Sequence, residues 1–298
     1  MNVFDYSKTP LIHNHSGRTG LLCLLGSPVA HSISPAMHNL ACSKLGLDYS
    51  YLAFDIDTTQ LAQAVEALKL LGARGWNLTM PDKNLMCSLC DRLSPAARLS
   101  GAVNTVVNEN GVLTGHTTDG IGYLRAAKDA GFVLAGSRIT LLGAGGAAVS
   151  IVVQAALDGA AAVTIFNRSG ANFQRMETIL QTLRQETSCC LSLYQYEDDK
   201  RFRQELQNSD LLINATSVGM TPDVEGCLIP DASYFHPHLV VSDIIYHPKK
   251  TRLLAMAEQA GLKTFNGMYM LLYQGAEAFR LWTGQEMPID IIKSSLTF

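Results

Sequence analysis

The sequence lacks three features that mark whole classes of protein: an excess of positive charge, a long apolar run and an apolar leader. Its 26 Asp and Glu residues outnumber 23 Lys and Arg residues, for a net charge of −3. That balance gives no electrostatic footprint for nucleic acid or for an anionic membrane surface. No apolar run reaches the ~20 residues that span a bilayer, and residues 1–18 have no signal-peptide core. We therefore expect a soluble, cytoplasmic protein that binds neither nucleic acid nor membrane.

The sequence also lacks a cysteine pattern typical of disulfides or zinc. Its seven cysteines are an odd number without a secretion signal, which favours reduced thiols. Cys87 and Cys90 form a Cys-x-x-Cys pair, but no second pair has zinc spacing, and a structural metal site needs about four ligands. We predict no metal, with redox or metal use of this pair as the alternative.

The first part of the chain alternates strand and helix patterns. Short apolar runs ending in glycine or polar residues predict strands, and Ser-Pro or Thr starts with Gly stops predict helices. Asn110–Gly111 is typical of a hairpin turn. The expected elements are strands over 21–27, 49–56 and 75–80, helices over 34–46, 58–72, 83–93 and 120–131, and a hairpin within 102–119. This alternation predicts an α/β fold, mostly parallel, and 298 residues allow two domains.

A dinucleotide-binding pattern begins at Arg138. A strand over 138–143 leads through Gly143, Gly145 and Ala148 into an apolar helix, and further strands follow in the order of a doubly wound Rossmann domain. Glycines let the backbone approach a pyrophosphate, whose charge the amides at the helix N-terminus bind. We assign Gly143, Ala144, Gly145, Gly146 and Ala147 to cofactor binding. The alternative is a Gly-rich turn without a ligand.

The second strand of that domain ends in Asn167, Arg168 and Ser169, which we also assign to cofactor binding. Sites that prefer NAD usually place an Asp or Glu here, on the ribose 2′-hydroxyl. A guanidinium and a hydroxyl suit a 2′-phosphate instead. The sequence therefore favours NADP and allows NAD; the alternative for Arg168 is a solvated loop charge.

Taken together, these motifs resemble the shikimate dehydrogenase family, including its quinate/shikimate dehydrogenase branch. The resemblance covers nearly the whole chain after residue 20. It rests on GSPVAHSISPAMHN, NLTMPDK, GAVNTVVN, TTDGIG, GAGGAA, FNRS, NATSVGM, DIIYHPKKTRLL and GMYMLLYQGAEAFRLWTG. It implies an N-terminal α/β substrate domain over 1–118, completed by C-terminal helices over 268–298, and a Rossmann NAD(P)-binding domain over 119–267.

The resemblance also implies an activity: reversible oxidation of shikimate, quinate or both to the 3-dehydro ketone, within the chorismate route of aromatic amino acid biosynthesis. Lys83 matches the family's catalytic lysine and Asp119 its partner, a pair that handles the proton. Ser32 and Ser34 would take the substrate carboxylate. The remaining substrate-binding candidates are Asn77, Thr79, Asn104, Thr118, Tyr246 and Gln274; by resemblance, Thr216, Ser217, Val218, Met220, Gly267 and Met268 join the cofactor site.

Each polar candidate has a plainer interpretation. Ser34 could cap a helix that begins at Pro35. Asn77 and Thr79 could satisfy loop backbone, and Lys83 could be a surface lysine in the first turn of a helix.

Two positions depart from the family pattern. Thr117 stands where the family usually has Asn, and Tyr269 replaces a glycine, which could reshape the pocket. These departures suggest a paralogue acting on shikimate, quinate or a related ring acid. The competing hypotheses are a non-catalytic ring-acid sensor, a reductase for a different polyol acid, and another Rossmann enzyme such as a methylenetetrahydrofolate dehydrogenase. A homodimer is allowed, but no sequence feature marks its interface.

Overall fold

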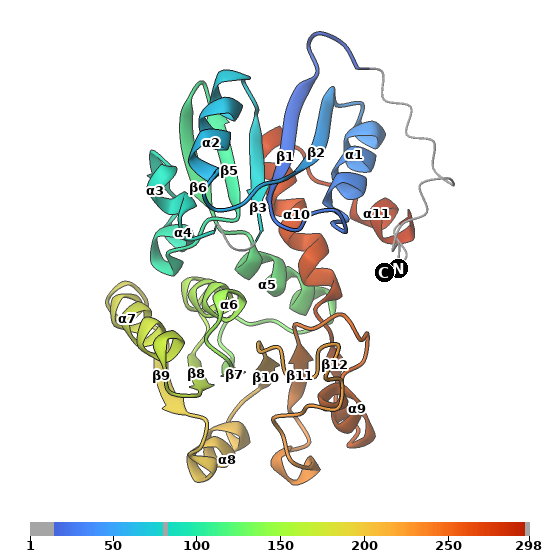
Figure 1. Ribbon diagram of the computed structural model, residues 1–298. Helices are drawn as coiled ribbons and strands as arrows, with labels where there is room; N and C mark the ends of the chain where they lie inside the picture. Colours follow the sequence, from blue (N-terminus) through green and yellow to red (C-terminus); the bar gives the residue numbers. More distant parts are fainter. Residues whose placement is uncertain (1–14, 80–82, 296–298) are drawn as a thin grey trace. The chain divides into compact units, whose positions relative to one another are not determined.

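The computed structural model describes residues 15–79 and 83–295. It divides into two compact units, Met1–Thr118 with Gly275–Phe298, and Asp119–Gln274. Each unit is built on its own six-stranded sheet in the described part of the chain (Figure 1). The α/β, two-domain fold predicted from the sequence is confirmed.

The first unit holds a mixed sheet in the order β2-β1-β3-β5-β6-β4. β1 pairs in parallel with β2 and β3, whereas β3, β5 and β6 are antiparallel neighbours. Its elements are β1 (Gly20–Gly26), α1 (Ser34–Leu45), β2 (Tyr49–Asp55), α2 (Leu61–Leu70), β3 (Gly75–Leu78), α3 (Met86–Leu89), β4 (Arg92–Leu93), α4 (Pro95–Ser100), β5 (Thr105–Glu109) and β6 (Val112–His116). The predicted hairpin is present, with Asn110 and Gly111 both at positive φ.

The helix expected over 83–93 is wrong for most of its length. Only Met86–Leu89 is helical, and Cys90 is already extended. Arg92 and Leu93 then pair with β6 as a short parallel strand. The Asp91 carboxylate also accepts from the amide of Leu113, so tertiary pairing overrides the local helical pattern.

Both faces of this sheet are covered, because alternate residues of a strand point to opposite sides. Cys23 and Leu25 of β1 pack into a core with residues of α2, α3 and α4. Leu22 and Leu24 point the other way, into a core that contains Ala278 and Trp282. Those two residues belong to α10 (Met268–Thr283), which α11 (Ile289–Ser295) follows.

The C-terminal segment is fastened to the sheet by polar contacts. The Trp282 indole donates to the Val106 carbonyl over 2.8 Å, and the Arg74 guanidinium donates to the Trp282 carbonyl over 2.8 Å. A Cβ at Gly75 would lie 2.2 Å from the indole nitrogen of Trp282, so only glycine permits this approach.

The outer edge of β2 is occupied by a side chain at one point. The amide of Asn39, on α1, donates to the Tyr51 carbonyl over 2.9 Å and accepts from the Tyr51 amide over 2.8 Å. The Asn39 side chain thus makes the two hydrogen bonds that a neighbouring strand would make there.

The second unit is a doubly wound domain with an all-parallel sheet in the order β12-β11-β10-β7-β8-β9. The order reverses beside β7, which creates a switch point at the carboxyl ends of β7 and β10. The elements are α5 (Asp119–Asp129), β7 (Arg138–Leu142), α6 (Gly146–Leu157), β8 (Ala162–Asn167), α7 (Ala171–Glu186), β9 (Cys190–Gln195), α8 (Asp199–Gln207), β10 (Leu211–Asn214), the 3-10 helix η2 (Ala232–Tyr234), β11 (Val240–Asp243), α9 (Arg252–Gln259) and β12 (Thr264–Phe265).

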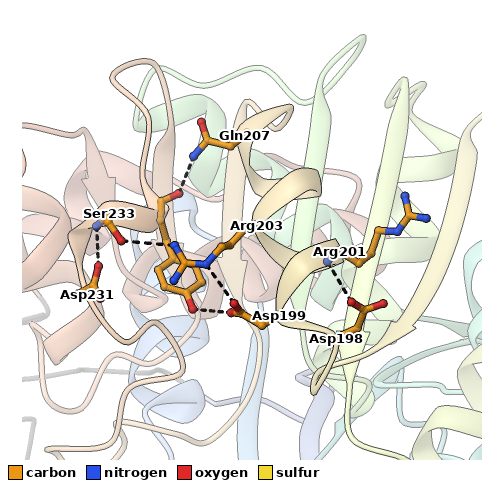
Figure 2. A network of polar contacts seen from close by, with 8 residues as sticks. Asp198, Asp199, Arg201, Arg203, Gln207, Asp231 and Ser233 are labelled. Carbon is orange, nitrogen blue, oxygen red and sulfur yellow. Dashed lines mark hydrogen bonds and ion pairs between the residues drawn. The ribbon is translucent and has the colours of Figure 1, made fainter.

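A polar clamp joins α8 to η2 on the surface of this unit, as Figure 2 shows. The Arg203 guanidinium lies 3.6 Å above the Tyr234 ring centroid and donates to Asp199 over 3.1 Å. The Tyr234 hydroxyl donates to the same carboxylate over 2.5 Å. The clamp holds Tyr234 over a core that includes Phe202.

Candidate active site

A buried network of short polar side chains lies in the sheet of the first unit. Asn77, in β3, stands opposite Thr105 of β5 and donates to its hydroxyl over 3.0 Å. The Thr105 hydroxyl donates to the Asn104 side-chain oxygen over 3.0 Å. Asn104 in turn accepts from the amide of Thr118 over 2.8 Å. None of these four residues is more than 5% exposed, so the network is preorganised inside the fold.

Three of the sequence-predicted substrate residues, Asn77, Asn104 and Thr118, are therefore brought together. Thr105 was missed, because only its register opposite Asn77 gives it a role. The alternative, that Asn77 satisfies backbone groups, is confirmed in part, because its side-chain amide also donates to the Asn104 carbonyl over 3.1 Å.

The serine pair lies at the start of α1. The helix begins at Ser34 itself, and its N-cap is Ile33, whose side chain makes no capping hydrogen bond. The interpretation of Ser34 as a helix cap is therefore wrong. The Ser34 amide donates to the Ser32 hydroxyl over 3.3 Å, and a helix N-terminus is a favourable place for a carboxylate.

Lys83 lies in a turn before α3 and is partly exposed, so the plainer interpretation that put it in the first helical turn is also wrong. Its carbonyl accepts from the amide of Val103 over 2.8 Å, which ties it to the residue before Asn104. Thr79 follows β3 and donates its amide to Leu25; the Met80–Asp82 part of the NLTMPDK motif lies outside the described residues. Asp119 opens α5 in the second unit, directly after Thr118 in the chain.

The glycine-rich turn after β7 has the geometry of a phosphate loop. Gly143 has a φ of +110°, and a Cβ there would lie 2.8 Å from the Ala215 carbonyl oxygen. Gly145 is the N-cap of α6, and a Cβ on Gly145 or Gly146 would meet no atom within 4 Å. Ala144 and Ala148 are buried, while Ala147 is partly exposed in the first turn. The turn thus leaves open space beside the amides at the helix start, which fits a dinucleotide pyrophosphate.

The end of β8 carries no carboxylate. The Asn167 side chain donates to the Arg168 carbonyl over 2.8 Å, and Arg168 and Ser169 are exposed. Exposure leaves the guanidinium available to a 2′-phosphate, and equally agrees with a solvated charge, so its role stays a prediction.

The loop after β10 is organised by Asn214. Its side-chain oxygen accepts from the Thr216 hydroxyl over 2.7 Å, and its amide donates to Val218 and to Asp243. Asp243, fully buried at the end of β11, also accepts from the Thr251 hydroxyl over 2.8 Å. Burial raises the pKa of Asp243, and its hydrogen bonds act in the opposite direction. Ser217 and Met220 are exposed on this loop.

Comparison with known proteins gives this geometry a family. The model of the shikimate dehydrogenase substrate binding domain matches residues 24–106, and that of the shikimate 5'-dehydrogenase C-terminal domain matches residues 267–297. A shikimate dehydrogenase (NADP(+)) from Listeria monocytogenes is 48% identical over 94% of this chain and 97% of its own length. The chain belongs to the shikimate dehydrogenase family. A shikimate dehydrogenase (NADP(+)) of Streptococcus pyogenes is 51% identical, again over 94% of this chain and 97% of its own length.

A solved structure of another family member supports the fold over nearly the whole chain. Shikimate 5-dehydrogenase from Listeria monocytogenes, in complex with shikimate and NAD, has a TM-score of 0.92 at 48% identity. The match covers 94% of this chain and 97% of that one.

The remaining family positions lie in the second unit. Tyr246 is 45% exposed, just after β11. A Cβ at Gly267 would lie 1.8 Å from the Ile244 carbonyl oxygen, so the chain needs glycine there. Met268 begins α10, and its amide donates to Asn266 over 3.1 Å. Gln274, further along α10, donates to the Leu271 carbonyl.

The two departures from the family pattern occupy different environments. Thr117 is buried. Tyr269 is 39% exposed and lines a cavity of about 300 Å³ with residues of α5, β12 and α9. An effect of Tyr269 on substrate choice stays a prediction.

Sequence reasoning missed Asp243 and Thr251, which fix the Asn214 loop. Both lie within the DIIYHPKKTRLL motif, but their role depends on which strand neighbours β10. Within residues 15–79 and 83–295, no three His, Cys, Asp or Glu side chains are grouped so as to hold a metal ion. In the same ranges, no helix combines the length and apolar character needed to cross a membrane.

Proposed function

We propose that this chain catalyses the reversible, NADP-linked oxidation of shikimate to its 3-dehydro ketone. The observation that carries the proposal is the buried polar network of Asn77, Thr105, Asn104 and Thr118. A small polyhydroxylated acid needs many fixed polar partners, since a buried polar group without one is costly. The names and near-complete coverage of the relatives support the same reaction.

Proton transfer is assigned to Lys83 and Asp119. Oxidation of a ring hydroxyl requires that its proton leave as the hydride leaves the carbon, and bound NADP supplies the hydride acceptor. The Lys83 amine takes the hydroxyl proton in that direction and returns it to the ketone oxygen in the other. Asp119 is assigned as the partner carboxylate that positions this amine. Both are attached to the network, Lys83 through Val103 and Asp119 through its chain neighbour Thr118.

The substrate carboxylate is assigned to Ser32 and Ser34. Their hydroxyls lie at the N-terminus of α1, a 12-residue helix whose first amides favour an anion. Asn77, Thr79, Asn104, Thr118, Tyr246 and Gln274 would hold the ring hydroxyls.

The cofactor assignment rests on the second unit. The turn Gly143–Ala147 would take the pyrophosphate, Arg168 and Ser169 the 2′-phosphate, and the loop Asn214–Met220 with Gly267 and Met268 the nicotinamide half. NAD remains a candidate for the same site, since loss of a carboxylate after β8 removes only a repulsion from the 2′-phosphate.

The test is an initial-rate matrix of shikimate or quinate with NADP or NAD. Lys83→Ala should lower kcat about 10²- to 10⁴-fold, the usual range for losing a general acid–base group. Lys44→Ala, an exposed lysine of α1, is the matched control and should leave the rates unchanged.

Three outcomes would contradict the proposal. Binding of a ring acid without turnover would make the chain a sensor. Turnover of quinate alone would mean that quinate, and not shikimate, is the substrate. Full activity of Lys83→Ala would mean that another group transfers the proton.

We also propose that the protein forms a homodimer and is located in the cytoplasm. Light scattering of the purified protein tests the first, and fractionation of the source cells tests the second.

A further inference from the structure

The phenol of Tyr51 reaches the polar network from the edge of the sheet. Tyr51 lies on β2 opposite Leu22, and Asn77 lies on β3 opposite Leu24, so the phenol spans β1. Its side chain is fully buried. Its hydroxyl donates to the side-chain oxygen of Asn77 over 2.8 Å.

This contact limits what Asn77 can offer a ligand. Its amide nitrogen faces the Asn104 carbonyl over 3.1 Å, and a carbonyl can only accept, which fixes the orientation of the amide. The second amide hydrogen goes to the Thr105 hydroxyl. Both donors of Asn77 are therefore used, and its oxygen, which has two lone pairs, has one taken by Tyr51. What remains, at a side chain that is 5% exposed, is the capacity to accept one hydrogen bond.

Tyr51 is itself held from two sides by α1. Asn39 binds its backbone amide and carbonyl. The His38 ring stacks on the phenol with centroids 4.4 Å apart and planes 11° apart. Ser34 begins the same helix. Tyr51 thus connects the helix that begins at Ser34 to the strand that carries Asn77.

The phenol stays a donor at every working pH. Burial raises the pKa of Tyr51 well above its ordinary value, with the neighbouring Cys23 acting in the same direction. The Ser34 side chain acts in the opposite direction, towards a lower pKa of Tyr51.

We propose that Tyr51 is a positioning residue for the ring acid. Its hydroxyl holds Asn77 as an acceptor for one non-reacting ring hydroxyl, at a fixed separation from the serines that take the carboxylate. This inference rests on the proposed function and adds a residue that touches no reacting atom. The consequence is that Asn77 selects a substrate hydroxyl that donates, at one position of the ring.

The experiment compares Tyr51→Phe with Tyr49→Phe in the full-length protein. The Phe variant of Tyr51 keeps the ring stacked on His38 and removes only the hydroxyl. Tyr49→Phe makes the same change two residues earlier on the same strand, at a partly buried tyrosine outside the network. Steady-state kinetics are measured with shikimate and with its two monodeoxy analogues, each lacking one non-reacting ring hydroxyl.

For Tyr51→Phe, the KM for shikimate should rise about three- to tenfold, because this factor corresponds to the net free energy of one neutral hydrogen bond. The kcat and the KM for NADP should stay within about twofold, because binding that is equal in the ground and transition states changes KM alone. With one of the two analogues, the KM difference between wild type and Tyr51→Phe should vanish. Tyr49→Phe should match wild type throughout.

Two results would overturn the inference while leaving the proposed function intact. One is an unchanged KM for shikimate in Tyr51→Phe. The other is an equal rise in KM for shikimate and both analogues, which would mean that the mutation merely loosens the domain. Failure of the wild-type protein to oxidise shikimate would instead overturn the proposed function itself.

Discussion

Two glycines of the phosphate loop should respond differently to substitution by alanine. The fold requires glycine at Gly143, whereas cofactor binding requires it at Gly145. At Gly143 the φ of +110° is unfavourable for any residue with a side chain, and a Cβ would press on the Ala215 carbonyl oxygen at 2.8 Å. Backbone strain costs about 1–3 kcal/mol, and overpacking costs about 1–3 kcal/mol. Gly143→Ala should therefore lower the free energy of unfolding by about 3 kcal/mol. That corresponds to a fall of roughly 6–12 °C in the thermal midpoint of a unit of this size.

Gly145→Ala is the contrasting variant. A Cβ there meets no atom within 4 Å, and the φ of −76° suits alanine, so only the small preference of helix N-caps for glycine over alanine is lost. Its stability should change by less than about 1 kcal/mol, while the KM for NADP should rise at least about tenfold, because the Cβ occupies the approach to the pyrophosphate. Urea unfolding and NADP kinetics on both variants test the pair. Equal midpoints for Gly143→Ala and wild type, or an unchanged KM for NADP in Gly145→Ala, would refute the reasoning.

Two further predictions concern buried polar groups. His38 is fully buried, and burial lowers its pKa from 6.5 to about 3. Below pH 6.5 the unfolded chain therefore binds a proton at His38 that the folded chain does not bind. The free energy of unfolding falls as the pH decreases from 6.5 towards 3. Between pH 6.5 and 5 the free energy of unfolding should fall by about 2 kcal/mol in the wild type. Denaturant titrations of His38→Phe, which keeps an aromatic ring, should not show this fall. The same pH dependence of stability in both proteins would contradict the prediction. Asn214→Ala removes the hydrogen bonds that the Asn214 side chain donates to Asp243 and Val218 and the one that it accepts from Thr216. The free energy of unfolding should therefore fall by about 2–3 kcal/mol. The KM for NADP should rise. Asn208→Ala, at an exposed asparagine of the same unit, serves as its control, and equal effects of the two variants would rule out a specific role for Asn214.

Local sequence signals were sufficient for most elements of the fold. The Asn110–Gly111 turn and the strand–glycine–helix unit around Gly143 depend on backbone preferences of a few residues, and both are present. The segment after Lys83 shows the limit of this reasoning. Its apolar spacing suits a helix, but Arg92 and Leu93 extend because β6 offers them a strand edge, and no local pattern contains that edge.

The candidate site divides in the same way. Asn77, Asn104 and Thr118 were found because they stand in short motifs with family spacing. Tyr51 and Thr105 have no such signal: the first depends on the strand order β2-β1-β3 and the second on its register opposite Asn77. Roles that arise from strand order and register become visible only when the sheet is assembled.

The side chain of Asn39 has a consequence for self-association. β2 is an edge strand, and its Leu52 and Phe54 are 47% and 38% exposed, a combination that invites a second chain to add its own strand. The amide of Asn39 already occupies the two backbone groups of Tyr51 that an incoming strand would need first. The edge is thereby blocked at Tyr51 without a proline or a charge, so a second copy could add its own strand there only by displacing the Asn39 side chain.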